Sequence, residues 1–216
     1  MPAIIALVAQ KGGAGKTTIA LNLADALRVD GHRVLVVDGD PQNSARIWAD
    51  VATERDVEAP TVVGATGPSL RSTVQGLVEG FDAVVIDTPP RMAAEAKAAM
   101  ALSHLVLVPV SPGPSDVWAL DQTIEALQEV QAVRPDLKAR VVLNRVDRRT
   151  ALASTIEEGV HSSGLEICAA KLGNRVAYPE AIAAGQGVCS YAGSSAAAKE
   201  VRSLYSEVLD VIGGNR

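Results

Sequence analysis

The chain has 216 residues, of which 48% are hydrophobic and 21% are charged, which excludes a disordered or collagen-like protein. Its formal net charge of −5 argues against a protein that coats nucleic acid with its whole surface, although a local basic patch stays compatible with it. Aromatic residues make up only 3%, so the core must consist of Val, Leu, Ile and Ala. That mixture suits helices packed closely on a sheet.

The cysteines and the apolar segments restrict the compartment. Cys168 and Cys189 are too few and too far apart for a CxxC metal or redox site, so we expect two buried, reduced thiols. No apolar run approaches the roughly 18 to 20 residues that a membrane span needs. The first apolar stretch is broken at Lys11 and has no basic region before it. We therefore expect a cytoplasmic protein that is neither exported nor bound to a membrane.

Strands and helices are expected to alternate along the chain. Residues 3–9 are apolar almost throughout, as in a strand covered on both faces, and a glycine-rich loop (10–15) and a helix (16–30) follow. Further strands are expected at 33–38, 83–87, 105–110 and 140–144, weaker ones at 61–63, 165–168 and 187–190, and a final helix at 195–212. This order predicts an α/β fold in one domain, 1–216: a single doubly wound, mostly parallel sheet with helices on both faces. Ligands of such sheets bind at the carboxyl ends of the strands.

The strongest motif is KGGAGKTT at residues 11–18, between a strand and a helix. Glycines let the backbone N–H groups of residues 13–16 approach phosphates, and the helix N-terminus adds its positive end. Lys16 can then reach the β and γ phosphates, and the Thr17 hydroxyl can ligate Mg²⁺. The common GxxxxGK[ST] pattern requires glycine at position 10, where this chain has Gln10. A glycine-rich turn without a ligand is the alternative interpretation.

The glycine pair and the extra lysine resemble the deviant Walker A motif, KGGxGK[ST], of the ParA/MinD family of ATPases. VDGDPQ at 37–42 is similar to the family's DxDPQ element, and VVIDTPP at 84–90 is similar to its Walker B element. The resemblance continues through 108–115, 143–145 and 175–188, and with the motif so near the first residue and Trp48 after DPQ, it points to the small ParF-like members. The resemblance implies that ATP is bound by Gly12, Gly13, Ala14, Gly15, Lys16, Thr17 and Thr18.

Three aspartates are expected beside the phosphates because each falls at or just past a strand end. Three carboxylates would repel a polyphosphate, so a divalent cation must mediate. Asp87 resembles the Walker B residue that holds Mg²⁺, and Asp38 resembles the family's supporting acid. We expect Asp40 to orient or activate the attacking water. Each aspartate taken singly could instead cap a helix or start a turn.

Two further residues take their expected roles from the resemblance. The family's signature lysine, here Lys11, crosses to the nucleotide of the other subunit, which implies a homodimer that encloses ATP. Asn144 ends a strand and is similar to the residue that hydrogen-bonds adenine in relatives, and a turn at 178–180 (Tyr178, Pro179, Glu180) is expected to wall the base. A solvated loop lysine and a capping asparagine are the alternatives.

The last helix and a basic cluster remain. The helix carries an apolar stripe opposite a face of mixed charge, whereas a membrane anchor would need a basic face, so we expect it to pack on the sheet. ParA proteins bind duplex DNA without sequence preference as ATP dimers, and doubling a modest patch across a twofold axis would suffice. An ordinary solvated face is the alternative. The candidate DNA contacts are Lys138, Arg140, Arg145, Arg148, Arg149, Lys171, Arg175, Lys199 and Arg202.

The sequence therefore predicts a Mg²⁺-dependent ATPase with ATP as its nucleotide. The resemblance implies that it dimerises on ATP, binds DNA nonspecifically at the nucleoid, is stimulated by a ParB-like or analogous partner, and positions a plasmid, a chromosome region or a protein cargo. The alternative is a phosphate-loop metabolic enzyme or a metallocluster-assembly ATPase of the same superfamily. The cysteine positions argue against an iron–sulfur protein, the single Tyr205 in the tail argues against a tyrosine kinase, and the DPQ element argues against a ligase such as dethiobiotin synthetase.

Overall fold

The computed structural model describes residues 2–90, 93–111, 113–146, 160 and 164–213. Its sheet has seven strands in the order β3-β2-β4-β1-β5-β6-β7, and every pairing among these strands is parallel. The predicted parallel sheet is confirmed. The strands are β1 (Ala3–Leu7), β2 (Val34–Asp38), β3 (Thr61–Gly64), β4 (Ala83–Asp87), β5 (Leu105–Val110), β6 (Lys138–Leu143) and β7 (Glu166–Ile167).

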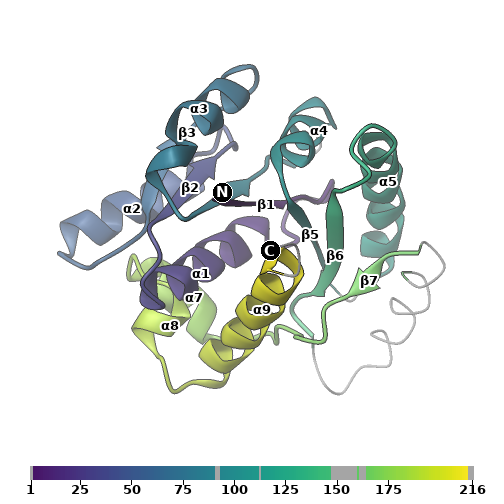
Figure 1. The fold of residues 1–216 in the computed structure, drawn as a ribbon. Coiled ribbons are helices and arrows are strands. Elements are labelled where there is room, and N and C mark those ends of the chain that lie inside the picture. Colours follow the sequence, from purple (N-terminus) through teal and green to yellow (C-terminus); the bar gives the residue numbers. More distant parts are fainter. Residues whose placement is uncertain (1, 91–92, 112, 147–159, 161–163, 214–216) are drawn as a thin grey trace.

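Helices cover both faces of the sheet because successive strand residues point to opposite sides. Ile5 and Leu7 of β1 belong to one core, and Ala6 and Val8 belong to the other. The first core is closed by α1 (Lys16–Val29), α2 (Ser44–Glu54), α7 (Ala177–Ala183), α8 (Val188–Tyr191) and α9 (Ala196–Gly213) (Figure 1). The second is closed by α3 (Ser69–Leu77), the short 3₁₀ turn η1 (Val78–Gly80), α4 (Ala93–Leu102) and α5 (Pro114–Gln131).

The final helix packs on the sheet, as expected from its apolar stripe. Val201, Leu204 and Val208 are each 1% exposed and lie in the same core as α1. Lys138 at the start of β6 donates a hydrogen bond of 2.6 Å from Nζ to the main-chain oxygen of Val211, near the C-terminus of α9. A cation at this end also opposes the negative end of the helix dipole.

Two local expectations are wrong. Residues 187–190 were expected as a strand but form the start of helix α8, because α1 supplies side-chain acceptors for its first N–H groups: Val188 N donates to Asn22 Oδ1 and Ser190 N donates to Asp25 Oδ2. Tyr178 was expected in a turn but lies within helix α7. At α8, contacts from a distant part of the chain outweigh local sequence preference.

Register brings the predicted aspartates to one edge of the sheet. Leu7 pairs with Asp87, and Asp87 pairs with Asp38, so the last residues of β1, β4 and β2 stand side by side. The glycine-rich loop leaves β1 at the same edge and leads directly into α1. The single domain over 1–216 stays a prediction.

Candidate functional site

The phosphate loop has the backbone shape that its glycines predict. Gly13 and Gly15 have φ of 78° and 97°, a region that residues with a side chain rarely adopt. Gly15 is the N-cap residue of α1, and its carbonyl accepts the N–H of Ile19 at 2.9 Å. The loop therefore ends at a helix N-terminus, where backbone N–H groups and the helix dipole favour an anion.

Lys16 is folded inward over this loop. It is 6% exposed, and its Nζ donates to the carbonyl oxygens of Ala9 at 3.0 Å and Lys11 at 3.3 Å. Burial lowers the pKa of Lys16, and the carboxylates of Asp87 and Asp40 act in the opposite direction. A buried ammonium whose hydrogen bonds to the described residues go to neutral oxygens favours a nearby anion strongly.

Asp87 at the end of β4 is a buried carboxyl without its full set of partners. It is 0% exposed, and neither Oδ1 nor Oδ2 accepts a hydrogen bond of normal geometry from the described residues. Burial raises the pKa of Asp87 to about 7, although the Thr17 hydroxyl and the Lys16 ammonium partly oppose the change. An unsatisfied buried carboxyl is costly, and a cation would relieve that cost.

These groups fit Mg²⁺ only together with phosphates. In the described part of the chain, no three His, Cys, Asp or Glu side chains gather as a metal site. Asp87 and the Thr17 hydroxyl can supply two oxygen ligands, and Mg²⁺ at phosphate sites is commonly bound by one or two protein oxygens plus the phosphates. The donor set therefore suits a nucleotide-bound Mg²⁺ better than a resident metal.

Asp38 has an anchoring role at the start of α2, which matches the helix-capping alternative that the sequence left open. It is 0% exposed; its Oδ1 accepts the N–H of Asp40 at 3.1 Å, and its Oδ2 accepts those of Ala45 at 3.0 Å and Arg46 at 3.1 Å. Burial raises the pKa of Asp38, and these backbone donors oppose the change. The carboxyl thus fixes both the Asp40 loop and the first turn of α2. The spacing from Asp38 to Ser44 gave no signal for this contact.

The Asp40 loop lies directly against the end of β4. Gly39 N donates to the main-chain oxygen of Asp87 at 2.9 Å, and a Cβ on Gly39 would come within 2.9 Å of that oxygen. Asp40 itself is half-buried, and its Oδ1 accepts the N–H of Gln42 at 2.9 Å. Its Oδ2 accepts no hydrogen bond among the interactions that the structure describes, so Asp40 presents a carboxylate oxygen at the phosphate edge.

Asn144 contacts the phosphate loop. Its Nδ2 donates to Ala14 O at 2.8 Å, and its Oδ1 accepts the N–H of Arg145 at 2.9 Å. A Cβ on Gly15 would lie 2.1 Å from that Nδ2, so Gly15 is also needed for this close approach. The adenine contact implied by the resemblance would require the amide to exchange partners.

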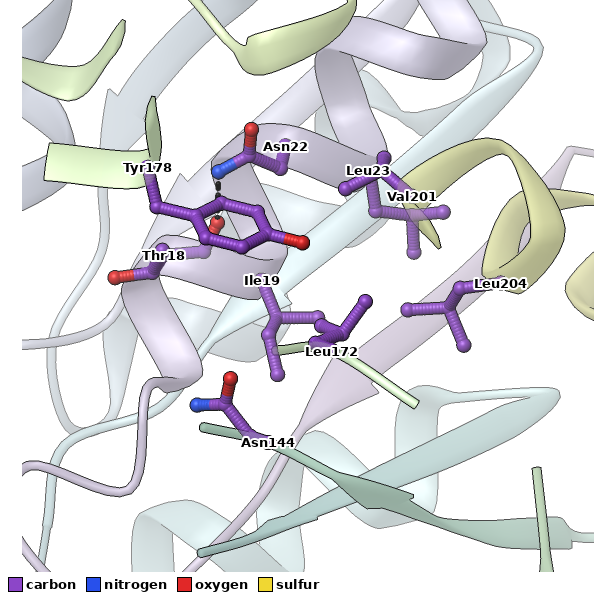
Figure 2. A pocket seen from close by; sticks show the side chains of 9 residues that line it. All are labelled: Thr18, Ile19, Asn22, Leu23, Asn144, Leu172, Tyr178, Val201 and Leu204. Atoms are coloured by element: carbon purple, nitrogen blue, oxygen red, sulfur yellow. Dashed lines mark hydrogen bonds between the residues drawn. The ribbon is translucent and has the colours of Figure 1, made fainter. Parts of the chain in front are cut away.

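A small cavity lies beyond Asn144, between α1, α7 and α9 (Figure 2). Its volume is about 10 Å³, which is room for a single water and not for a base. Tyr178 points into it with a buried ring, and its hydroxyl lies 3.5 Å from Ala197 O and 3.3 Å from Glu200 Oε2. Pro179 and Glu180 are exposed. Tyr178 therefore packs in the interior beside α1, and a wall for the base at 178–180 stays a prediction.

Residues 5–188 match the family model of the CobQ/CobB/MinD/ParA nucleotide binding domain. This chain belongs to the ParA/MinD family. It is 32% identical over 212 residues to the maintenance of carboxysome distribution protein A of Halothiobacillus neapolitanus, covering 95% of each chain. It is 31% identical over 240 residues to the chromosome-partitioning ATPase Soj of Thermus thermophilus, covering 95% of this chain and 94% of that one. The fold is similar to that of Cyanothece McdA in an ATP complex, with a TM-score of 0.77, 16% identity and coverage of 98% and 96%.

Lys11 stands at the position of the signature lysine of the ParA/MinD family, at the start of the phosphate loop. Its side chain is half-buried, and the neighbouring Gly12 and Gly13 are exposed. Lys16, in contrast, is directed inward from the same loop. The two lysines of the loop therefore differ in burial, since Lys16 is buried and Lys11 is half-buried.

Several of the predicted DNA contacts have partners within the protein. Lys138 caps α9, Arg140 pairs with Glu166 at 2.8 Å, and Arg202 donates to Gly193 O at 2.7 Å. Arg175 donates from Nε to both carboxylate oxygens of Glu200, at 2.9 and 3.0 Å. Arg148 and Arg149 lie outside the described residues. Arg145, Lys171 and Lys199 are exposed, and Lys171 also has an interaction within the protein.

Two of these exposed cations share a hollow. Lys171 and Lys199 line a cavity of about 390 Å³ together with Arg175 and Glu200.

Across the described residues, no helix combines the length and apolar character needed to span a bilayer. Both thiols are buried, and burial raises the pKa of Cys168 to about 12 and that of Cys189 to about 11, as expected of unreactive core cysteines.

Proposed function

We propose that this protein is a Mg²⁺-dependent ATPase that dimerises on ATP and positions a cargo by cycling between nucleotide states. The observation that carries the proposal is the buried, unsatisfied carboxyl of Asp87 beside the inward-folded ammonium of Lys16. A phosphate group with Mg²⁺ satisfies both charges at once. Membership of the ParA/MinD family supports ATP as the nucleotide.

The residues at the carboxyl edge of the sheet have separate roles in the hydrolysis of ATP. The N–H groups of the phosphate loop and Lys16 bind the phosphates, and Thr17 and Asp87 hold Mg²⁺, with Asp38 as the supporting acid. When bound, Mg²⁺ neutralises charge on the transferring and leaving phosphates. Asp40 orients the attacking water with its free carboxylate oxygen, and Lys11 of each subunit contacts the nucleotide of the other.

The proposed cycle includes DNA and a partner protein. In the ATP dimer, Arg145, Lys171 and Lys199 of both subunits form a basic surface for duplex phosphates, which places the protein at the nucleoid. A ParB-like or analogous partner stimulates hydrolysis and releases the dimer. Relatives of nearly equal identity are named for carboxysome distribution and for chromosome partitioning, which supports a positioning role for a protein or DNA cargo. A metabolic enzyme of the same superfamily is the alternative.

Retention on duplex DNA distinguishes a positioning ATPase from a metabolic enzyme. We expect the protein with ATP to be retained by nonspecific duplex DNA and to release it with ADP. Replacing Arg145 and Lys199 by Ala should lower the slope of log affinity against log salt by about 0.9 for each phosphate that the protein no longer neutralises. The control is Arg55→Ala with Arg71→Ala, two exposed arginines associated with α2 and α3. ATP hydrolysis without any retention on DNA would favour the metabolic alternative.

A further inference from the structure

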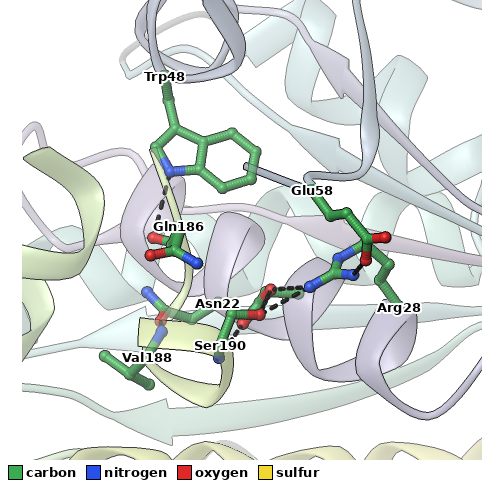
Figure 3. Close-up of polar contacts among 8 residues, drawn as sticks. Asn22, Arg28, Trp48, Glu58, Gln186, Val188 and Ser190 are labelled. Carbon is green, nitrogen blue, oxygen red and sulfur yellow. Dashed lines mark hydrogen bonds and ion pairs between the residues drawn. The ribbon is translucent and has the colours of Figure 1, made fainter. Parts of the chain in front are cut away.

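Residues 185–190, which run from the end of α7 into the first residues of α8, form a segment that we call the brace. It runs between α1, which begins at the phosphate loop, and α2, which follows the Asp40 loop (Figure 3). The contacts of the brace with these two helices join parts of the chain that are more than 130 residues apart. It therefore connects the two loops whose relative position the hydrolysis of ATP requires.

On the α1 side, the brace is held by two buried polar side chains. Asn22, 2% exposed, accepts the N–H of Val188 on Oδ1 at 2.8 Å and donates from Nδ2 to Thr18 O at 2.7 Å. Asp25, 1% exposed, accepts the N–H of Ser190 at 3.0 Å and its hydroxyl at 2.5 Å. Asn22 thus links the brace directly to the first turn of the helix that carries Lys16 and Thr17.

On the α2 side, the brace lies against the helix itself. Trp48 is 2% exposed, and its Nε1 donates to Gln186 O at 3.3 Å. Gly185 has a φ of 73°, and a Cβ there would come within 2.6 Å of the backbone nitrogen of Ala52. The first turn of this same helix is bound by Asp38, whose other oxygen holds the Asp40 N–H.

The brace packs against α1 as closely as it packs against α2. A Cβ on Gly187 would lie 2.4 Å from Cβ of Asp25, so only glycine allows the chain to pass there without displacing the helix. Arg28 completes this side, because its guanidinium donates to Asp25 at 3.2 Å and to the Ser190 hydroxyl at 2.7 Å. Hydrogen bonds and close backbone contact together fix the brace relative to both helices.

We propose that the brace sets the position of the Asp40 loop relative to the phosphate loop, so that Asn22 and Trp48 are positioning residues for hydrolysis. The inference rests on the proposed function, because it assigns Asp40 to the attacking water. Rotating or shifting α2 against α1 moves Asp40 relative to the phosphates while the phosphate loop keeps its own shape. Misplacement of a reacting group by about 1 Å can cost roughly 100-fold in rate. Loss of the brace should therefore lower kcat and leave nucleotide affinity nearly unchanged.

The test uses Trp48→Phe and Asn22→Ala in the full chain. Trp48→Phe keeps an aromatic ring but removes the hydrogen bond to Gln186 and part of the buried ring volume. Asn22→Ala removes the hydrogen bonds to Val188 and to Thr18. Each variant should lower kcat about 5- to 20-fold with Kd for ATP within about twofold of the wild type. The double variant should lose no more than the larger single loss, because both changes release the same segment.

Tyr205→Phe is the matched control. The Tyr205 hydroxyl contacts Asp30, so this change loosens a contact between α9 and the C-terminal end of α1 without affecting α2. It should leave kcat unchanged. Amide hydrogen exchange adds a readout besides activity: residues 38–46 should exchange faster in Trp48→Phe and Asn22→Ala than in the control.

Three outcomes would decide against the proposal. Both variants could keep the wild-type kcat, the losses could appear equally in Kd, or Tyr205→Phe could lower kcat to the same extent. If Asn22→Ala does not fold, Trp48→Phe alone decides by the same criteria. Absence of ATP hydrolysis in the wild type would instead contradict the proposed function, and the hydrogen exchange of residues 38–46 would then still decide whether the brace orders the Asp40 loop.

Discussion

The side-chain amide of Asn144, directly after β6, donates a hydrogen bond of 2.8 Å to the main-chain oxygen of Ala14 in the phosphate loop, 130 residues earlier in the chain. This bond joins the loop to a strand that lies two positions away from β1 in the sheet. The sequence resemblance assigns the same residue to the adenine base. The structure therefore gives Asn144 a loop-holding contact that is independent of the base.

Replacing Asn144 by Ala separates the two roles. The change removes a buried hydrogen bond, which costs about 1 to 3 kcal/mol where a partner is left unsatisfied. If the contact with Ala14 matters most, affinity should fall about 5- to 50-fold for ATP, GTP and inorganic tripolyphosphate alike, measured by calorimetric titration. A loss confined to ATP would show that Asn144 reads the base. Asn174→Ala, on a residue outside the phosphate loop, is the control.

Asp40→Ala should keep ATP binding and abolish hydrolysis. The phosphate loop and Asp87 remain, whereas the water is no longer oriented, and general base or orienting groups contribute about 10²- to 10⁴-fold. The ATP dimer should accumulate, which light scattering would detect. Asp40→Asn is the companion variant, because its Oδ1 can still accept the N–H of Gln42 and preserve the turn. Hydrolysis at the wild-type rate in both would remove Asp40 from the mechanism.

Lys11→Ala should fold and bind nucleotide as a monomer but not dimerise in ATP. The expected loss in hydrolysis is about 10³- to 10⁵-fold, by analogy with an arginine supplied from another subunit. Lys16→Ala should instead lose nucleotide binding, because its ammonium lies inside the loop. Sedimentation with ATP measures both. A Lys11→Ala protein that dimerises and hydrolyses normally would show that Lys11 is an ordinary loop lysine.

Asp87→Asn should stabilise the protein without nucleotide or Mg²⁺ at high pH. The folded-state pKa of Asp87 is raised to about 7 by burial, so its contribution to stability is present below the unfolded value of 3.8 and is lost as pH rises through 7. The variant should exceed the wild type by about 2 to 4 kcal/mol at pH 8 and match it near pH 4. Denaturant unfolding at the two pH values measures this.

Asp210→Asn is the control for these unfolding measurements, since Asp210 is exposed and lies on α9 away from the strand ends. Mg²⁺ with ATP should reduce the difference in unfolding free energy between Asp87→Asn and the wild type at pH 8, because the bound cation stabilises the wild-type carboxylate and not the amide. A wild-type protein that is as stable as Asp87→Asn at pH 8 without ligands would mean that the buried carboxyl carries no penalty.

The sequence by itself determined the parts that depend on neighbouring residues. Continuous apolar runs specify buried parallel strands, and GGAGK at a strand end specifies an anion-binding turn, since both signals reside in local backbone and burial preferences. The order of strands and helices then places Asp38 and Asp87 at one edge, because the carboxyl ends of parallel strands coincide. These elements needed no knowledge of distant contacts.

Only the tertiary structure decided how the polar side chains are shared. Lys138, Arg140 and Arg175 look like a DNA-binding cluster in the sequence, yet each has a partner within the protein that is at least 25 residues away. Residues 187–190 were expected as a strand but begin a helix, and Asn22, 166 residues before Val188, accepts the first N–H group of that helix. A hydrogen bond is satisfied by whichever group packing brings within reach, and long-range packing is not written in local periodicity.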